Sequence, residues 1–431
     1  MSTTNVGVIV AHPGTQHSYE TALAMQKCGL LREYVTGVYF KSNSLAARAQ
    51  RYLPGRVGIA IRQIIHRRSR AGLDDTLVQT SPLMEMAYLA SARVPFATSI
   101  AGNIMLVRNE MFDRNIANRV SRLRPDAVIA YDSCALETFR AAARVGALKV
   151  LDQTNAHLAY WAGVLDEEAE RAKGDAGAIR RPHPRLVARC IAEAKEADLI
   201  LVGSDFVRGS LDAVGIDSSK AVVLPYGADV ELFKPKETHA PKNCVTIAFA
   251  GQIGLRKGVR YMLDAVAGLQ GAKCRVLLIG KVTDDCEWLK RYANHFLHVP
   301  FVPREKLAEC LQEADLFVYP SLSEGSALAI YEALACGLPV ITTPNSGSVV
   351  RDSIEGYIVP ARDVEALRDR IKRLVLDSDL RSTMASAARA RAEKYSWNNY
   401  HESLAELMRK ALGLAHSYPE GSDCATTAVS L

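Results

Sequence analysis

Hydrophobic residues recur along the chain in short runs rich in β-branched positions, and longer amphipathic segments separate them. Five runs lie in the first half, at residues 6–12, 34–40, 126–131, 148–153 and 199–204. Six more follow at residues 221–227, 244–251, 274–280, 315–321, 338–343 and 356–361. Apolar strands that alternate with helices are typical of parallel sheets covered on both faces. The pattern therefore predicts an α/β protein with two doubly wound sheets.

A polar stretch separates the two series. Residues 231–243, ELFKPKETHAPKN, are rich in proline and lysine and poor in apolar periodicity, as interdomain linkers are. We expect a first domain at residues 1–220 and a second at 221–395. A helix at 396–415 should pack back toward the first domain. Small polar residues at 416–431 cannot support a core and predict a disordered tail.

The composition is that of a globular protein with two or three domains. The chain has 431 residues, of which 48% are hydrophobic and 23% are charged. Its nine cysteines form no CxxC pair, and the N-terminal apolar run is too short for a signal peptide or a membrane span. We therefore expect a cytoplasmic protein, which could lie at the inner face of the membrane.

Arginines concentrate in one segment, residues 48–70, RAQRYLPGRVGIAIRQIIHRRSR, although the formal net charge is only +6. Such a segment could contact anionic lipid or nucleic acid. We favour a solvated basic helix face, because aromatic residues that would stack on bases are nearly absent there. Peripheral contact with an anionic membrane stays open as an alternative, and no nucleic acid partner is expected.

Ligands of doubly wound sheets bind at the carboxyl ends of the strands. The segments that follow predicted strands are therefore the first candidates for a site. These segments are residues 12–17, 152–157, 251–258, 280–281 and 319–343.

Two glutamates, Glu324 and Glu332, stand in the otherwise apolar stretch YPSLSEGSALAIYEALACGLPVITT. High helix propensity up to Gly337, a suitable left-handed cap, predicts a helix over residues 326–336. The helical rise then separates the two carboxylates by roughly 10 Å. A glycosidase that forms a covalent intermediate needs its carboxylates about 5 Å apart, so the spacing argues against that class.

The start of the same helix is a candidate anion site. Backbone amides at a helix N-terminus have no partner within the helix, and the helix dipole favours negative charge there. The amides concerned belong to Gly325, Ser326, Ala327 and Leu328. An anion between two carboxylates that accept hydrogen bonds from hydroxyls describes a nucleotide-sugar. The alternative to a ligand-binding role is that Glu332 is a solvated helix residue.

A second loop, FAGQIGLRKGVRYML at residues 249–263, places Arg256 and Lys257 at the start of a helix. Cations are electrostatically misplaced there unless an anion is bound, and the two could neutralise a diphosphate. The loop is neither a G-x-x-x-x-G-K-[ST] loop nor a G-x-G-x-x-G fingerprint. ATP hydrolysis and NAD binding therefore lose support.

Taken together, these motifs resemble the retaining glycosyltransferases of family four, which have the two-domain GT-B fold. The pattern of a glutamate, seven residues and a second glutamate in SEGSALAIYEALACGLPVITT carries the resemblance. The segments EADLILVGSDF, VVLPYGADVELFKP, FAGQIGLRKGVRYML, EADLFVYPS and AEKYSWNNY agree with it in the family's order. They span residues 197–397, and their combination is specific to the family. The resemblance implies two Rossmann-like domains that face each other across a deep cleft.

The resemblance assigns roles to individual residues of the second half. Glu324 would accept hydroxyls of the donor sugar, Glu332 would hold the ribose, and Lys257 would pair with the diphosphate. Gln252 stands where many relatives have an arginine, and Arg256 could supply that charge. Further donor contacts are expected from Gly251, Gly280, Lys281 and Val302.

The first half resembles the family more loosely. Relatives often have a pair of glycines after the first strand, whereas AHPGTQHSYE offers only Gly14, followed by Thr15. Both could approach the donor phosphate or the acceptor. Relatives also have a histidine near the reacting sugar, and we assign that role to His157, with Asp152 as the alternative.

The resemblance implies a retaining enzyme that moves a sugar from a UDP- or GDP-sugar to a saccharide or lipid-linked saccharide, in polysaccharide or glycoconjugate biosynthesis. The nucleotide-sugar is a co-substrate, and neither a cofactor nor a metal is expected. Two alternatives remain: an epimerase or phosphorylase of the same architecture, or a non-catalytic binding module of that fold.

Overall fold

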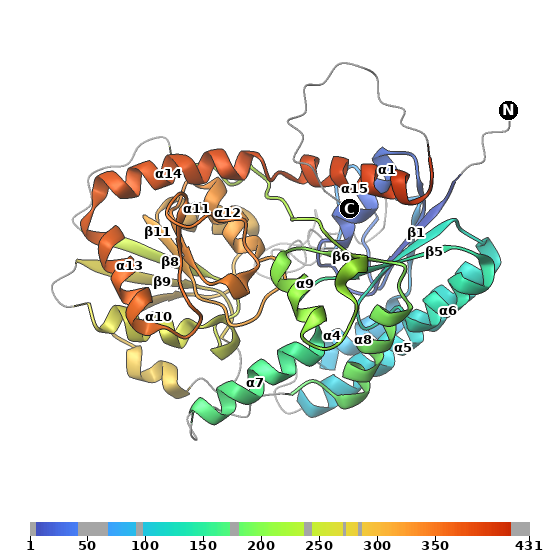
Figure 1. The fold of residues 1–431 in the computed structure, drawn as a ribbon, viewed down its shortest axis with the longest axis horizontal. Coiled ribbons are helices and arrows are strands. Elements are labelled where there is room, and N and C mark those ends of the chain that lie inside the picture. The colour runs from blue at the N-terminus through green and yellow to red at the C-terminus, as the bar shows by residue number, and fades with distance from the viewer. Residues whose placement is uncertain are drawn as a thin grey trace, which may run out of the picture.

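The computed structural model describes residues 6–41, 68–91, 98–172, 181–236, 244–269, 273–282 and 287–414. Two parallel sheets, each flanked by helices, form two halves that lie side by side (Figure 1). This arrangement confirms the predicted pair of doubly wound, Rossmann-like sheets. Three predicted features fall wholly or partly outside the described residues: the tail at 416–431, residues 48–67 of the arginine-rich segment, and the second half of the linker.

The first sheet has seven parallel strands in the order β3-β2-β1-β4-β5-β6-β7. They are β1 Val8–His12, β2 Leu31–Thr36, β3 Val78–Thr80, β4 Ala127–Tyr131, β5 Leu148–Gln153, β6 Leu199–Val202 and β7 Ala221–Val223. Every residue of β1 and β4 is buried. Helices cover both faces of these strands, which is why their sequences are continuous apolar runs.

Helices of the first half pack on both faces of this sheet. They are α1 Ser18–Lys27, α4 Pro82–Ser91, α5 Thr98–Leu123, α6 Leu136–Val145, α7 Leu158–Ala172, α8 Pro184–Glu196 and α9 Asp205–Asp212, with the short η2 Ser218–Lys220. The helices α5, α6 and α8 form one layer, whereas α1 packs against the C-terminal helix α15, Trp397–Ala411, on the other face (Figure 1).

The second sheet has six parallel strands in the order β10-β9-β8-β11-β12-β13. They are β8 Val245–Ala250, β9 Cys274–Ile279, β10 Phe296–Val299, β11 Leu316–Tyr319, β12 Val340–Thr342 and β13 Gly356–Ile358. Its helices are α10 Val259–Ala267, α11 Arg304–Gln312, α12 Leu328–Ala335, α13 Val364–Leu376 and α14 Ser378–Glu393, with η3 Leu255–Lys257, η4 Glu287–Tyr292 and η5 Pro344–Ser346. The helix pairs α10 with α13 and α12 with α14 pack together (Figure 1).

The structure corrects several predicted strands. The run at 221–227, predicted as the first strand of the second series, instead forms β7 and pairs with β6 at the edge of the first sheet. The short α9 connects β6 to β7 and brings them into parallel register. The pattern missed β3 and β10, because β3 has only three residues and β10 is partly exposed. The strand predicted at 34–40 runs over Leu31–Thr36.

The chain passes between the two halves twice, and the two passages are hydrogen-bonded to each other. The amide of Ala228 donates to the carbonyl of Tyr395 at 2.9 Å. A Cβ on Gly227 would lie 2.3 Å from the backbone carbon of Ser396, so only glycine allows this approach. After this point α15 packs on α1 of the first half (Figure 1).

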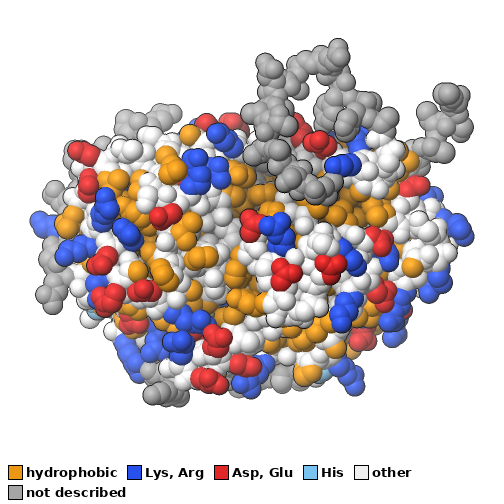
Figure 2. Space-filling model, in the orientation of Figure 1, with side chains coloured by type: hydrophobic (Ala, Val, Ile, Leu, Met, Phe, Trp, Pro, Cys, Tyr) orange, Lys and Arg blue, Asp and Glu red, His pale blue; other side chains and the backbone are white. Residues whose placement is uncertain are grey.

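The face of the protein shown in Figure 2 carries mixed charge. Lys and Arg side chains are interspersed with Asp and Glu side chains over both halves in Figure 2. Of the described helices, none combines the length and the apolar character that crossing a bilayer requires.

Candidate functional site

Each sheet has a topological switch point, where the strand order reverses and a crevice opens at the carboxyl ends of two strands. In the first sheet it lies between β1 and β4, and in the second between β8 and β11. The loops concerned are residues 12–15 and 132–135 of the first half and 251–257 and 320–327 of the second. The second pair contains most of the residues predicted to bind a donor.

A compact charged cluster occupies the switch point of the second sheet. Lys257, on the loop after β8, forms an ion pair with Glu324, on the loop after β11. Arg256 Nη1 lies 3.3 Å from Glu324 Oε1 and donates to the Ser323 carbonyl at 2.7 Å. The Tyr319 hydroxyl accepts from Lys257 Nζ at 2.8 Å and donates to Glu324 Oε2 at 2.9 Å. Three of the residues predicted as catalytic are therefore in direct contact.

Burial shapes the electrostatics of this cluster. Lys257 and Glu324 are each 8% exposed. Burial, and to a smaller extent the neighbouring Arg256, lower the pKa of the Lys257 ammonium well below its usual range. A bound anion would oppose both effects, because it would favour the charged form of the lysine. The cluster has two cations for one carboxylate and can accept a further negative charge.

The turn at residues 325–328 differs in part from the prediction. The helix α12 begins at Leu328 rather than at residue 326, with Ala327 as its N-cap. The Ala327 amide donates to the Ser346 carbonyl at 3.2 Å, so it is not free to bind an anion. The Ser326 hydroxyl contacts the Tyr331 hydroxyl at 2.7 Å. Leu328, at the first position of α12, has an amide with no partner within the helix.

Gly325 lies against the other half of the protein. A Cβ at this position would lie 1.8 Å from the Thr154 carbonyl oxygen, so a side chain cannot be accommodated. Ser204 of the first half donates to the Gly325 carbonyl at 2.6 Å, and the Ala156 amide donates to the Glu324 carbonyl at 3.3 Å. The charged cluster therefore stands at the contact between the two halves.

Glu332 is separate from this cluster. It lies in the middle of α12, is 8% exposed, and pairs with Arg304 of α11 at 3.0 Å. Burial raises the pKa of the Glu332 carboxyl, and Arg304 opposes the effect. The interpretation of Glu332 as a solvated helix residue is therefore wrong. The two glutamates contact different cations, as expected if they act at different places.

The remaining predicted donor residues lie on neighbouring loops. Gly251 follows β8, and its amide donates to the Ile279 carbonyl at 2.9 Å. Gly280 follows β9 and packs against the Gly251 carbonyl oxygen. The side chains of Gln252 and Lys281 are exposed, and Val302, after β10, is partly exposed. All five follow strands of the second sheet at their carboxyl ends.

Gly14 and Thr15 follow β1 at the switch point of the first sheet. Both are partly exposed, and the Gly14 carbonyl accepts from the Thr36 hydroxyl at 3.2 Å. The Gly14 backbone packs on the imidazole of His12. Burial, with a smaller contribution from Arg108, lowers the pKa of His12 to about 3.

His157 directly follows Ala156, whose amide donates to the Glu324 carbonyl, but its own hydrogen bonds are to other segments. It is fully buried, its amide donates to the Ser210 hydroxyl at 2.9 Å, and Nδ1 accepts from the Ala159 amide at 3.2 Å. Burial lowers the pKa of its imidazole, an effect that the backbone of Cys190 opposes. The alternative, Asp152, pairs with His17 at 2.8 Å and is also buried.

Sequence reasoning missed the segment after β4, although it borders the first switch point. Ser133 there has a positive φ of 76°, which is uncommon for serine. The Asp132 carboxylate accepts from the Thr154 hydroxyl at 2.9 Å and so supports the loop against which Gly325 packs. The polar residues Asp132 and Ser133 directly after the run DAVIAY were the available signal.

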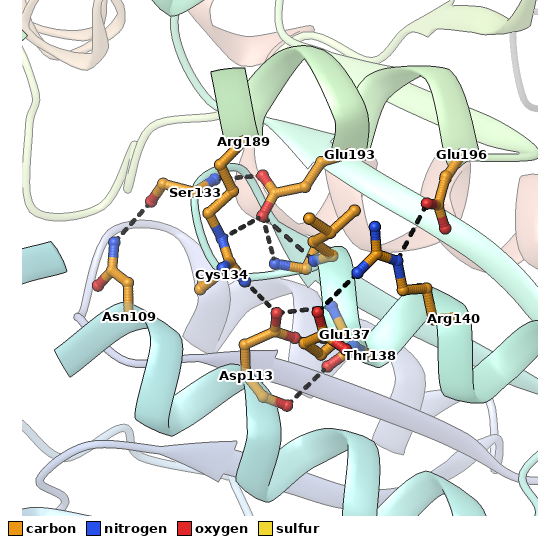
Figure 3. Close-up of polar contacts among 12 residues, drawn as sticks. Asn109, Asp113, Ser133, Cys134, Glu137, Thr138, Arg140, Arg189, Glu193 and Glu196 are labelled. Atoms are coloured by element: carbon orange, nitrogen blue, oxygen red, sulfur yellow. Dashed lines mark hydrogen bonds and ion pairs between the residues drawn. The ribbon is translucent and has the colours of Figure 1, made fainter. Parts of the chain in front are cut away.

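Two buried carboxylates hold this segment in place. Glu193 accepts from the amides of Ser133 and Ala135, at 2.6 and 2.8 Å, while Asp113 accepts from the amide of Thr138 at 2.8 Å. Arg189 bridges the two carboxylates (Figure 3). Each of these groups has hydrogen-bond partners, which is typical of a structural network.

Comparisons with known proteins identify a similar family and similar folds. Residues 230–391 match the family model "Glycosyl transferases group 1". A D-inositol 3-phosphate glycosyltransferase of Corynebacterium urealyticum is 32% identical over 260 residues, which cover 52% of this chain and 61% of that protein. The match thus spans about three-fifths of the relative's length.

Solved structures match over nearly the whole chain. The HepE protein of Anabaena, in complex with UDP and glucose, has 14% identity and a TM-score of 0.62, and the match covers 94% of this chain and all of that one. Sucrose-phosphate synthase of Thermosynechococcus elongatus has 16% identity and a TM-score of 0.64, with 95% and 99% covered. These likenesses confirm the predicted GT-B fold. Residues 230–391 are therefore similar to the glycosyl transferases group 1 family, and the chain as a whole has the GT-B fold.

Proposed function

We propose that the protein is a retaining glycosyltransferase that moves a sugar from a UDP- or GDP-sugar to a hydroxyl of a saccharide or lipid-linked saccharide. The observation that carries the proposal is the cluster of Arg256, Lys257 and Glu324 at the contact between the two halves. The corresponding pathway would be polysaccharide or glycoconjugate assembly.

The donor diphosphate would bind to Arg256 and Lys257, close to the first amides of α12. In this step the phosphates replace the Glu324 carboxylate as partner of the two cations. Glu324 then becomes available to accept hydroxyls of the donor sugar. Arginine and lysine beside a phosphate form charge-assisted hydrogen bonds, which are stronger than neutral ones.

The nucleoside would extend toward Glu332, whose carboxylate would accept the ribose hydroxyls in place of Arg304. Backbone near Val302 would face the base. The glycine pair Gly251 and Gly280 lets the ends of β8 and β9 pack closely, since a Cβ on Gly280 would lie 1.9 Å from the Gly251 carbonyl oxygen. The Anabaena HepE protein forms a complex with UDP and glucose, which supports a donor of this chemical class.

Negative charge develops on the departing diphosphate as the glycosidic bond breaks. Arg256, Lys257 and the start of α12 would stabilise that charge, and such preorganised electrostatic contacts are usually the largest contribution to catalysis. A phosphate oxygen would take the proton of the acceptor hydroxyl on the same face of the sugar, which retains the anomeric configuration. The buried imidazole of His157 is then not required as a base.

The first half would bind the acceptor at its own switch point, near Gly14, Thr15 and Ser133. Contact between Gly325 and the Thr154 loop would exclude water from the donor. The seven cysteines within the described ranges are free thiols, which supports a reducing compartment such as the cytoplasm.

Turnover of a radiolabelled nucleotide-sugar, with and without a saccharide acceptor, tests the proposal. Lys257→Ala and Glu324→Ala should each lower kcat by about 10²–10³-fold, because each removes stabilisation of the developing charge. Lys306→Ala, at an exposed lysine of α11, is the matched control and should leave kcat unchanged. Circular dichroism and the Tm report whether each variant is folded.

Product analysis separates the proposal from its alternatives. The anomeric proton coupling in the NMR spectrum of the product should show the configuration of the donor. Consumption of the donor without an acceptor, to give an isomeric sugar, would instead identify an epimerase. Near-normal rates in both alanine variants would contradict the assigned site.

A further inference from the structure

A second cluster of buried charges borders the switch point of the first sheet. Glu85 of α4 accepts from Arg68 Nη2 at 3.1 Å and from Arg108 Nη1, on α5, at 2.9 Å. The arginine side chains are 13% and 12% exposed, and that of Glu85 is 3% exposed. Two cations share one anion, so the cluster has one excess positive charge.

Neighbouring groups in the described part of the chain do not neutralise this charge. The nearby Arg70 already pairs with Glu20 at 2.9 Å. His12 interacts electrostatically with Arg108, and its low pKa of about 3 keeps it neutral at physiological pH. An uncompensated charge in a largely buried place is costly unless a partner arrives.

Two buried polar atoms of the same cluster have no hydrogen-bond partner in the described structure. They are Arg68 Nη1 and the Tyr19 hydroxyl. Tyr19 is only 7% exposed, and its hydroxyl interacts electrostatically with Arg68 and Glu85. Buried polar atoms are nearly always hydrogen-bonded, so two in one place indicate a missing ligand. That ligand should be negatively charged and accept hydrogen bonds.

Hydrogen bonds connect the cluster to the crevice. Arg108 Nη2 donates to Asn109 Oδ1 at 2.7 Å. Figure 3 shows the next bond, in which Asn109 Nδ2 donates to the Ser133 hydroxyl at 2.9 Å. Ser133 follows β4, and His12 ends β1 and packs under Gly14. The Glu85 cluster thus lies against both strands of the first switch point, β1 and β4. It belongs to the first half, whereas the cluster around Glu324 belongs to the second.

We infer that Arg68, Arg108 and Tyr19 bind an anionic group of the acceptor, a phosphate or a carboxylate. The inference rests on the proposed function, in which the first half binds the acceptor. Guanidinium groups match the geometry of both oxyanions and can donate two parallel hydrogen bonds. The Tyr19 hydroxyl would donate a further bond, and the excess charge would be neutralised. A neutral saccharide would leave the buried charge without a partner.

Isothermal titration of inorganic phosphate into the full chain tests this inference, with acetate as a second titrant to represent a carboxylate. Saturating UDP or GDP first fills the diphosphate site, so that phosphate cannot bind at Lys257. Phosphate or acetate should bind to the wild type, and the tighter titrant identifies the oxyanion. Arg68→Gln should weaken binding at least tenfold, and Tyr19→Phe should weaken it severalfold.

Arg119→Gln is the matched control, because Arg119 is also on α5 and pairs with Glu33 in a partly exposed contact. It should bind the anion within twofold of the wild type. The inference is overturned if neither titrant binds to the wild type, or if Arg68→Gln and Tyr19→Phe bind as tightly as the wild type. If Arg68→Gln does not fold, anion binding by Tyr19→Phe tests the inference instead, because that variant removes only one oxygen.

Failure of the proposed function would appear separately, as a wild type that binds neither UDP nor GDP. The titrations would then be made in a Lys257→Ala background, which removes one of the two cations that pair with Glu324. Dependence of phosphate binding on Arg68 would still support an anion site, whereas its absence would reject one.

Discussion

At the scale of single residues, the proposed donor site has an internal counter-ion. Glu324 neutralises Lys257 and also lies within ion-pair distance of Arg256. A diphosphate must displace this carboxylate before it can bind the two cations. The same exchange would free Glu324 to contact the sugar, so donor binding and sugar recognition would be coupled through one side chain.

His12 provides a pH-dependent prediction at this scale. Burial lowers its pKa to about 3 in the folded protein, whereas the unfolded value is 6.5. The folded state therefore binds fewer protons than the unfolded state between these values. The contribution of His12 to stability is complete above pH 6.5 and is lost as the pH falls toward 3, by up to about 1.4 kcal/mol per pH unit.

Urea unfolding between pH 7 and pH 5 measures this slope. His12→Asn should make the free energy of unfolding less dependent on pH in this window. His295→Asn, at an exposed histidine, is the control. Its free energy of unfolding should depend on pH with the same slope as that of the wild type. Equal slopes in His12→Asn and the wild type would contradict the assignment.

At the scale of elements, the start of α6 depends on two other helices. Its own N-cap residue, Ala135, has no side chain that could accept a hydrogen bond. Carboxylates of α5 and α8 accept the amides instead, namely Asp113 for residues 137 and 138 and Glu193 for residues 133, 135 and 136 (Figure 3). This network fixes the segment after β4, which borders both the proposed acceptor crevice and the Thr154 loop.

Asp113→Ala should destabilise the protein strongly. The change leaves buried Arg189 without one of its carboxylates and two amides of α6 without an acceptor, which should cost about 3–5 kcal/mol. Urea unfolding gives the free energy. Asp363→Ala is the control, because it removes an exposed N-cap of α13 and should cost only about 1 kcal/mol. Equal losses in the two variants would show that the network adds nothing to ordinary capping.

Local patterns predicted the elements more reliably than the contacts between them. Buried parallel strands such as β1 and β4 are continuous apolar runs, so their positions could be derived from the sequence. The edge strand β10 is partly exposed and lacks that signal. β7 was found as a strand but assigned to the wrong sheet, because an apolar run does not reveal its neighbours.

The same distinction holds for the candidate site. Arg256, Lys257 and Glu324 follow strands and form recognisable local motifs, so their proximity was predictable. The ion pair of Glu332 with Arg304, and the contact of Gly325 with Thr154, join distant segments and have no local signal. The ion pairs of Glu85 with Arg68 and Arg108 also join distant segments, so they too have no local signal in the sequence.

At the scale of the whole molecule, the two halves touch at a second place besides Gly325. Glu168 of α7 accepts from the Tyr261 hydroxyl, on α10, at 2.9 Å and also pairs with Arg362. Glu168 is only 3% exposed. The chain crossings at Gly227 and Ser396 keep the halves connected. If the crevice opens, the contact at Gly325 and the contact at Glu168 would both have to separate. Closure of the two halves over a bound donor would require reversible contacts of this kind.

Glu168→Gln should favour an open arrangement. The amide keeps the shape of the side chain but leaves Arg362 with only the exposed carboxylate of Glu167 as a counter-ion, which should weaken the contact by about 2 kcal/mol. Small-angle X-ray scattering should show a larger radius of gyration without nucleotide. Glu167→Gln is the control, since Glu167 also contacts Arg362 but is 60% exposed, and such pairs contribute about 0–1 kcal/mol. Identical scattering from Glu168→Gln and the wild type would argue against this role.

The most direct test of the donor site is a thermal-shift titration with UDP, GDP, ADP and dTDP. At about 100 times its dissociation constant, the correct nucleotide should add about 2.7 kcal/mol to the stability of the folded protein and raise the Tm by several degrees. The shift should disappear in Lys257→Ala and persist in Lys306→Ala. A wild type that responds to none of the four nucleotides, or a Lys257→Ala variant that responds as strongly as the wild type, would contradict a diphosphate bound at this cluster.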